Sequence, residues 1–343
     1  MTTPVSAGGG STVLVVTERE SDTGDAVTLA LQDLSVRVVR FDLADVARRH
    51  VVLNAQCRKG RWEGSLTVGA RITDLADIRA ILWFHPGVPR IRVDGMTPAE
   101  ARWASGEATA GLAGVLGSLD CLHVNHPADI RRAEVKADVL AAAERCGLAV
   151  PPTWIGSDPS SARRFARAAG AGGGVITKAL TLPQITEPGS RVRSLYTAQV
   201  SVDDLGAVTD GVTQLQHRVR TNYAVRAHTL GTRTVAVRID AGTAASRTDW
   251  RADLESLTYT PTTLPPPVED ALAALARHYR LSYAASDLLV DAAGAWHFVD
   301  LNPAGQYRWL EVAQPGLGIS RALAVLLAGR NEFLTPAPEV HAD

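Results

Sequence analysis

The chain has 343 residues, of which 46% are hydrophobic and 21% are charged, and its formal net charge is −1. This composition is typical of a globular protein of roughly two or three domains. The near-zero charge excludes a basic surface for nucleic acid or an anionic membrane. The three cysteines, Cys57, Cys121 and Cys146, are far apart, which indicates neither a disulfide framework nor a zinc site and favours the reducing cytoplasm. We find no signal peptide and no apolar run of the roughly 18 to 20 residues that a membrane span needs.

Strand and helix patterns alternate at the start of the chain. An apolar run at 12–17 has the length of a strand, an amphipathic helix is predicted at 26–34, and a second strand follows at 36–42. This order predicts a parallel sheet with a right-handed crossover. Because no G-x-G-x-x-G follows the first strand, the sequence does not support a dinucleotide site there.

A hairpin at 61–73 and a buried strand at 80–85 follow. His85 ends this strand, where we expect a hydrogen-bonded structural histidine and not a catalytic one. Helices are predicted at 98–119, 130–146, 159–169, 268–279 and 319–327. Lys136 lies near the start of the second of these helices, and Gly147 ends it.

A strand predicted at 175–180 carries Lys178. Burying an ammonium group is costly without an anionic partner, so a lysine on a strand that faces a cleft indicates an anionic ligand. The segment at 183–192 is rich in turn-forming residues and is predicted to be a mobile loop that covers the site.

The last hairpin gathers side chains that carry oxygen. Its strands are predicted at 286–290 and 296–302, joined by a short turn that contains glycine. The carboxylates of Asp287 and Asp300 can then lie on neighbouring strands, with Asn302 on the same face as Asp300. A few hard oxygen ligands suit Mg²⁺, which completes its shell with water and substrate phosphates. The alternative is a surface hairpin whose polar residues are solvated or cap turns.

These three residues resemble the metal ligands of the ATP-grasp ligases, usually written D…E-x-N-P, with Asp300 where that family mostly has Glu. The longer run D-L-N-P-A-G-Q-Y-R-W-L-E, at 300–311, is similar to one branch, the graspetide (microviridin-type) ribosomal peptide maturases, where V-N-P-x-G-Q-x-x-W-L-E is usual. The triplet D-W-R at 249–251 and the block N-H-P-x-x-I-R-R-A-E-V-K at 125–136 also resemble that branch.

The resemblance implies a nucleotide site. In the family, lysines at the positions of Lys136 and Lys178 contact the phosphates of ATP, which suits a flexible point charge. The segment at 212–219 corresponds to the hinge whose backbone reads the adenine edge, and Gln216 and Val219 are the expected nucleotide contacts there.

Two arginines are predicted to be catalytic. Arg226 matches the Y-x-x-R of the family, and Arg238 lies on the next of two alternating strands predicted at 221–240. Arginines beside a magnesium–phosphate site would stabilise the charge that develops on an acyl phosphate and its tetrahedral adduct. Alternation also places arginines on solvated faces, which is the alternative for Arg238.

The resemblance covers essentially the whole chain and implies a fold of the α/β and α+β classes, the ATP-grasp fold. We expect an N-terminal parallel-sheet domain at 1–125, a central lid subdomain at 126–213 and a C-terminal catalytic subdomain at 214–335. The remaining residues, 336–343, are predicted to be a frayed tail.

The implied cofactors are ATP and Mg²⁺, and the implied reaction is carboxylate activation. An Asp or Glu side chain of a ribosomal precursor peptide, made of leader and core, becomes an acyl phosphate and is captured by Thr, Ser or Lys of the same peptide as a macrocyclic ester or amide. The expected partner is this peptide, without nucleic acid or membrane, and a homodimer remains open.

Two alternatives stay open at this point. The first is an ATP-grasp ligase that joins a free amino acid or amine to a peptide, and only the graspetide-like motifs argue against it. The second is a scaffold that binds nucleotide and peptide without catalysis. Aspartate at position 300, and His217 and Thr221 in place of the usual acidic residue and lysine of the hinge, keep this second alternative open.

Overall fold

The computed structural model describes residues 11–170, 174–181, 184–187, 191–243, 249–250 and 253–330. Its N-terminal sheet has the strand order β2-β1-β6-β7, and all its strand pairs are parallel. The elements are β1 (Thr12–Thr17), α1 (Asp22–Asp33), β2 (Arg37–Phe41), β6 (Ile78–Phe84) and β7 (Leu122–Val124). The predicted parallel sheet is therefore confirmed. Its central strand β1 is buried at every position, as expected for a strand covered on both faces.

A second sheet of the N-terminal region is antiparallel and comprises β3 (Val51–Arg58), β4 (Arg61–Val68) and β5 (Arg71–Asp74). The hairpin of β4 and β5 was predicted, whereas β3 was not. Its residues Val51, Leu53 and Ala55 pack on the N-terminal core and alternate with more exposed residues, so the apolar alternation typical of a half-buried strand was present in the sequence and was missed. The helix α2 (Pro98–Gly117) follows β6, begins with a capping box of Thr97 and Glu100, and confirms the helix predicted there.

The single helix predicted at 130–146 is wrong, because the structure has two helices in its place. These are α3 (Pro127–Ala133) and α4 (Lys136–Arg145). The chain leaves the helical conformation at Val135, with φ −78° and ψ 89°. The break lets α4 turn and pack on the C-terminal sheet, and it places Lys136 in the first turn of α4.

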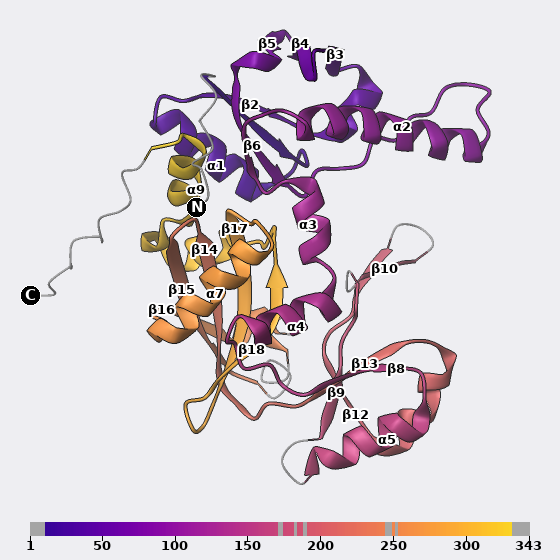
Figure 1. Ribbon diagram of the computed structural model, residues 1–343, viewed down its shortest axis with the longest axis vertical. Helices are drawn as coiled ribbons and strands as arrows, with labels where there is room; N and C mark the ends of the chain where they lie inside the picture. Colours follow the sequence, from indigo (N-terminus) through magenta and orange to yellow (C-terminus); the bar gives the residue numbers. More distant parts are fainter. Residues whose placement is uncertain are drawn as a thin grey trace, which may run out of the picture.

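The central sheet has the order β12-β9-β13-β8 and lies apart from the N-terminal and C-terminal sheets (Figure 1). Its elements, with the helices that cover it, are β8 (Thr153–Gly156), α5 (Pro159–Ala168), β9 (Val175–Thr177), β12 (Ala198–Val200), η4 (Val202–Asp210) and β13 (Thr213–His217). Two further strands, β10 (Gln184–Glu187) and β11 (Arg191–Ser194), pair as a hairpin where a loop was predicted. The rest of that predicted loop, and part of the glycine-rich turn before β9, lie outside the described residues.

The C-terminal sheet is antiparallel, with the order β16-β15-β14-β17-β18. Its strands are β14 (Thr221–Leu230), β15 (Arg233–Ala241), β16 (Leu257–Thr262), β17 (Tyr283–Asp291) and β18 (Trp296–Asn302), and its helices are α7 (Pro266–His278), α8 (Arg308–Ala313) and α9 (Ile319–Leu327). The helices α4 and α7 cover one face of this sheet through a shared core. The predicted C-terminal hairpin and the closing helix are confirmed. No helix in the described part of the chain is long and apolar enough to cross a membrane.

The N-terminal and C-terminal sheets share one hydrophobic core. It includes Val13 of β1 and Phe84 of β6 from the first sheet, and Leu230, Tyr283 and Leu323 from β14, β17 and α9. We refer to these two sheets, with α1 to α4 and α7 to α9, as the platform. The six-residue core of the central sheet is separate from that of the platform.

A buried amide fastens the two halves of the platform. Asn125, 1% exposed, donates to the carbonyl oxygens of Tyr283 and Pro303, both at 2.7 Å. Its own oxygen accepts from the backbone N–H groups of Ser282 at 2.8 Å and Tyr283 at 3.1 Å. All four hydrogen-bonding positions of this side chain are therefore used.

Candidate active site

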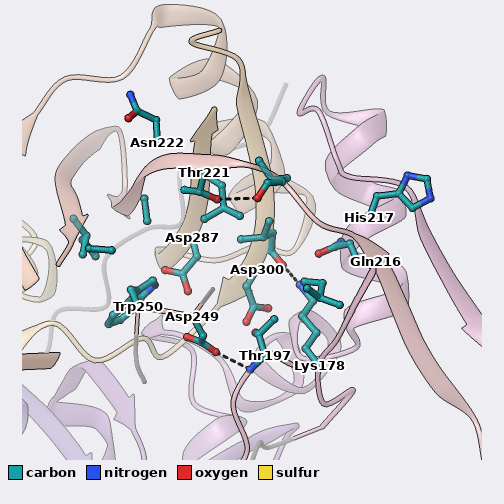
Figure 2. A pocket seen from close by; sticks show the side chains of 17 residues that line it. Lys178, Thr197, Gln216, His217, Thr221, Asn222, Asp249, Trp250, Asp287 and Asp300 are labelled. Atoms are coloured by element: carbon teal, nitrogen blue, oxygen red, sulfur yellow. Dashed lines mark hydrogen bonds between the residues drawn. The ribbon is translucent and has the colours of Figure 1, made fainter. Parts of the chain in front are cut away.

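A cleft opens between the central sheet and the C-terminal sheet, and seventeen residues line it (Figure 2). Part of its lining is apolar and includes Ile176 of β9, Leu289 of β17 and Val299 of β18. Another part is polar, where the carboxylates of Asp287 and Asp300 lie side by side (Figure 2). The cleft thus joins an apolar slot to an acidic pair.

Strand register brings the two carboxylates together. Asp287 of β17 pairs directly with Asp300 of β18, and the strand irregularity lies just after Asp287. On the other side of β17, Asp287 pairs with Arg226 of β14. Residues directly opposite each other project from the same face of a sheet, so these three side chains meet at one spot. The predicted convergence of Asp287 and Asp300 is confirmed.

Cationic groups from three different elements surround this acidic pair. Arg226 Nη1 donates to Asp287 Oδ1 at 2.8 Å. Lys136 Nζ, from α4, lies 3.6 Å from Asp300 Oδ2, and Nζ of Lys178, which directly follows β9, donates to the Val299 carbonyl oxygen at 2.6 Å. The chain has only three lysines, and two of them reach this place.

The acidic pair is the candidate magnesium site. Asp287 and Asp300 have side chains that are 13% and 23% exposed, so both remain accessible from the cleft. Two hard oxygen donors beside lysines fit Mg²⁺ bound to phosphates, because that ion takes one or two carboxylates and fills its shell with phosphate oxygens and water. In the part of the chain that the structure describes, no cluster of three or more His, Cys, Asp or Glu offers a rival site.

The third predicted ligand has a different setting. Asn302 lies on the same face as Asp300 but is outside the cleft lining, and its Oδ1 accepts from the N–H of Ala304 at 3.0 Å. The side chain thus closes the turn after β18. Its remaining lone pair is free to face a metal ion, and its role as a ligand stays a prediction.

The segment predicted as the hinge, at 212–219, borders the cleft. Gln216 and Val219 both line the cleft, as expected of nucleotide contacts. Gln216 Nε2 donates to Thr153 Oγ1 at 2.8 Å, so this side chain fixes β13 against the start of β8. His217 points away from the carboxylates (Figure 2), packs against Phe165 at 4.6 Å between ring centroids, and therefore leaves the cleft side of the hinge to the backbone.

The structure does not bring Arg238 to the site. It pairs with Val225, which packs in the core under α7, so its side chain lies on the face opposite Arg226. There Arg238 forms a bidentate pair with Asp240, at 2.8 and 2.6 Å, and its guanidinium lies 4.0 Å from the ring centroid of Tyr223. The Asp240 carboxylate accounts for the raised pKa of this guanidinium.

Two residues that the sequence did not assign also line the cleft. Asp249, 6% exposed, accepts from the N–H of Thr197 at 2.9 Å and so links the C-terminal half to the segment before β12. Trp250 lies with its ring 5.8 Å from the guanidinium carbon of Arg226. The D-W-R triplet was the signal that could have identified them, and its third residue, Arg251, lies outside the described residues.

The graspetide-like residues after β18 serve mainly to hold the structure together. Glu311 accepts from the backbone N–H and the hydroxyl of Ser320, at 2.7 and 2.5 Å, and so caps the start of α9. Trp309 packs between Trp250 and Tyr259, at 5.2 and 5.0 Å between ring centroids, which supports one side of the cleft.

The loop between β18 and α8 also contacts the N-terminal half of the platform. Gln306 Oε1 accepts from Thr23 Oγ1 of α1 at 2.9 Å. His85 Nε2 lies 2.6 Å from the Ala304 carbonyl oxygen. His85 is thus the hydrogen-bonded histidine at the end of a strand that the sequence predicts.

Comparisons with known proteins agree with this geometry. No protein-family model and no curated protein sequence matches the chain. Solved structures do match. The Chryseobacterium gregarium RiPP-associated ATP-grasp ligase, in complex with ADP and a leader and core peptide, is 25% identical with a TM-score of 0.84, covering 93% of this chain and 96% of that one.

The macrocyclase MdnC from Microcystis aeruginosa MRC, bound with the precursor peptide MdnA, is 23% identical with a TM-score of 0.80, and the match covers 93% of this chain and 99% of that one. The ATP-grasp ligase PsnB, complexed with a minimal precursor, Mg and ADP, is 19% identical with a TM-score of 0.65, and the match covers 92% and 97% of the two chains. The chain therefore has the ATP-grasp fold, in the form that the RiPP-associated ATP-grasp ligases share.

Proposed function

We propose that this protein is an ATP-dependent macrocyclase that closes ester or amide crosslinks in a ribosomal precursor peptide. The observation that carries the proposal is the pair Asp287 and Asp300, surrounded by Lys136, Lys178 and Arg226 at the polar end of the cleft. Two carboxylates encircled by cations match a triphosphate held together with Mg²⁺, because each component neutralises its neighbour.

The residues that line the cleft suit a nucleotide that lies along it. Its base fits the apolar slot between Ile176 and Leu289, with its edge toward the backbone of the hinge near Val219. Its phosphates extend toward Lys178, which directly follows β9, and Lys136, the first residue of α4. Ammonium groups on flexible stems suit phosphate oxygens as point charges.

The residues of the acidic pair would hold Mg²⁺, with Asn302 as a third oxygen donor. The ion would supply charge neutralisation on the transferring phosphoryl group. Arg226 is buried and lies against Asp287, so its guanidinium offers a fixed positive charge beside the reacting phosphate. We include Arg226, and not Arg238, among the residues that contact the reacting groups.

The reaction balances without a nucleophile from the protein. A carboxylate oxygen of an Asp or Glu of the peptide attacks the γ-phosphorus of ATP, and ADP leaves with the electron pair of the broken bond. A hydroxyl or amine of the same peptide then attacks the acyl carbon, loses its proton, and expels inorganic phosphate. Each ring therefore consumes one ATP and removes the elements of one water from the peptide.

A peptide substrate is supported by the matched structures. All three are described in complex with a precursor peptide, a minimal precursor, or a leader and core peptide, and one of them is described as a macrocyclase. Co-expression of this chain with each short peptide that is encoded near its gene, followed by mass spectrometry, is the test. The expected product is lighter than the precursor by one water per ring.

Two other masses would argue against a macrocyclase. A product heavier by an amino acid or amine would identify a ligase that joins two molecules. A precursor of unchanged mass, with ATP present and the protein folded, would favour a binding scaffold. Asp300→Ala, run beside the wild type, shows whether any change in mass depends on the acidic pair.

A further inference from the structure

The guanidinium of Arg226 lies against the main chain of the loop that follows β18. Its Nη2 donates to the Gln306 carbonyl oxygen at 3.1 Å, while Nη1 donates to Asp287. Gly305 permits this approach, because a Cβ at that position would lie 2.8 Å from Arg226 Nη2 and 2.3 Å from the Cβ of Ala285. The position of Arg226 is thus set by the position of this loop.

The loop is held from behind by a buried tyrosine. Tyr283 is 1% exposed, and its hydroxyl donates to the Gly305 carbonyl oxygen at 2.5 Å. A carbonyl oxygen only accepts, so the single proton of the hydroxyl points toward Gly305. The adjacent peptide unit then presents the Gln306 carbonyl oxygen to Arg226.

A buried histidine fixes the direction of that bond. His228 is 0% exposed, and its Nδ1 lies 3.0 Å from the Tyr283 hydroxyl oxygen. Because the tyrosine proton is already used, the hydroxyl must accept here, and His228 must carry its proton on Nδ1. Burial and the nearby Arg226 charge lower the pKa of His228 well below its usual value, so the ring stays neutral.

These contacts form one ordered chain of donors: His228 Nδ1–H to the Tyr283 hydroxyl, and the Tyr283 hydroxyl to the Gly305 carbonyl oxygen. None of its members lines the cleft, yet the chain ends on the peptide segment that Arg226 binds. Arg226 Nε is buried without a partner among the described residues, so its two Nη contacts carry much of its orientation.

We propose that Tyr283, oriented by His228, is a positioning residue for Arg226. It holds the loop at 305–306 so that the guanidinium faces the acidic pair at the end of the cleft. This inference rests on the function proposed above, because it needs a reaction in which Arg226 stabilises the reacting phosphate. It assigns the tyrosine no contact with substrate or nucleotide.

The test is a double-mutant cycle on ATP turnover in the presence of the precursor peptide, with Tyr283→Phe, Arg226→Lys and the double variant. Tyr283→Phe should lower kcat about 10- to 100-fold, the usual range when a group is slightly displaced. The KM for ATP should stay within about twofold, because the lysines and the hinge still hold the nucleotide. In the Arg226→Lys background, Tyr283→Phe should lower kcat no further, because the group through which it acts is gone.

Tyr307→Phe is the matched control. Tyr307 is 0% exposed and its ring lies 6.1 Å from that of Tyr283, but its hydroxyl meets Ser320 and not the loop. Both variants should lower the unfolding temperature by similar amounts, whereas only Tyr283→Phe should lower kcat. Calorimetric titration with a non-hydrolysable ATP analogue should give the wild-type affinity for both.

The inference is overturned if the effects of Tyr283→Phe and Arg226→Lys on kcat multiply, or if Tyr307→Phe lowers kcat as much. If Tyr283→Phe does not fold, the same cycle with His228→Leu decides, with an expected fall in kcat of about threefold to tenfold. If the wild-type protein forms no rings, the proposed macrocyclase function is contradicted. If the wild type is active and the two effects on kcat multiply, only the positioning role of Tyr283 is contradicted.

Discussion

The platform and the central sheet of this protein are built in opposite ways. The platform joins two sheets of distant sequence through one core of twenty-five buried residues and through the four hydrogen bonds of Asn125. The central sheet has a core of six buried residues, capped by α5 and η4. Stability is thus concentrated on the side that holds the acidic pair and Arg226, and the side that brings Lys178 is the more weakly built.

This difference assigns separate tasks to the two regions. Groups that stabilise a transition state must be held within a fraction of an ångström, and those on β14, β17 and β18 are fixed by strand register and a large core. Groups that only bind the nucleotide tolerate more movement, and a loop that covers a nucleotide site has to open for entry and release.

The largest effect is expected at the acidic pair. Asp300→Ala should reduce peptide-dependent ATP turnover about 1,000-fold or more, because it removes a carboxylate that would hold Mg²⁺ beside the transferring phosphoryl group. The unfolding temperature should hardly change, since Asp300 is partly exposed and its contact with Lys136 is 3.6 Å long. Turnover is measured by phosphate release.

Asp291→Ala is the control for this variant. Asp291 ends the same β17, but its carboxylate binds His297 and the backbone of the turn, outside the cleft. It should keep full turnover. An active Asp300→Ala protein would contradict the assignment of the acidic pair.

The next largest effect is expected at Asn125, whose hydrogen bonds join the two halves of the platform. Asn125→Leu leaves two carbonyl oxygens and two N–H groups buried without partners, which should cost about 4 kcal/mol of unfolding free energy. Denaturant unfolding followed by far-UV circular dichroism measures this cost. A loss below about 1 kcal/mol would show that water reaches these groups and that the amide is not a fastening.

Sequence reasoning found what depends on local pattern. The hairpin of β17 and β18 follows from strand alternation and a short turn, and these place Asp287 beside Asp300. The wrong expectation for Arg238 was avoidable, because the two-residue turn at Gly231 and Thr232 pairs Leu230 with Arg233 and therefore Val225 with Arg238. Counting from that turn puts Arg226 and Arg238 on opposite faces.

Contacts between distant segments were beyond that reasoning. Nothing near Asn125 in the sequence shows that it binds Tyr283, 158 positions later. Likewise, Thr23 meets Gln306 only because two sheets share a core. The break at Val135 escaped for a similar reason, because residues 130–146 have good helix propensity and the turn between α3 and α4 is imposed by packing on different sheets.

Matched leucines compare the two regions directly. Leu205 of η4 is 1% exposed in the core of the central sheet, and Leu323 of α9 is 0% exposed in the core of the platform. Either residue changed to alanine should cost about 3 kcal/mol. Hydrogen exchange should separate them: Leu205→Ala should raise exchange only in β8 to β13, whereas Leu323→Ala should raise it in both platform sheets. Equal exchange patterns would show that the regions unfold as one unit.

A smaller effect is expected for the grip on the nucleotide. Lys178→Ala removes one point charge near the phosphates and should weaken binding of a non-hydrolysable ATP analogue about tenfold, or about 1.4 kcal/mol. Calorimetric titration measures the affinity. Lys59→Ala, which removes the one lysine that lies near neither the cleft nor the acidic pair, should leave the affinity unchanged. Equal affinities of Lys178→Ala and the wild type would contradict the proposed path of the phosphates.

The smallest effect concerns the way the unfolding free energy depends on pH through the buried His228. Burial first, and the Arg226 charge second, lower the pKa of His228 in the folded protein, whereas an unfolded histidine titrates near a pKa of about 6.5. Below that pH the unfolded chain binds a proton that the folded chain does not bind, so the platform loses stability as the pH falls, by about 1.4 kcal/mol per pH unit.

His228→Leu removes this contribution, while His123, whose pKa is also lowered by burial, stays in both proteins. The unfolding free energy of the variant, measured by denaturant between pH 7 and about pH 5, should therefore fall less steeply than that of the wild type. Parallel curves would mean that His228 accepts a proton in the folded state.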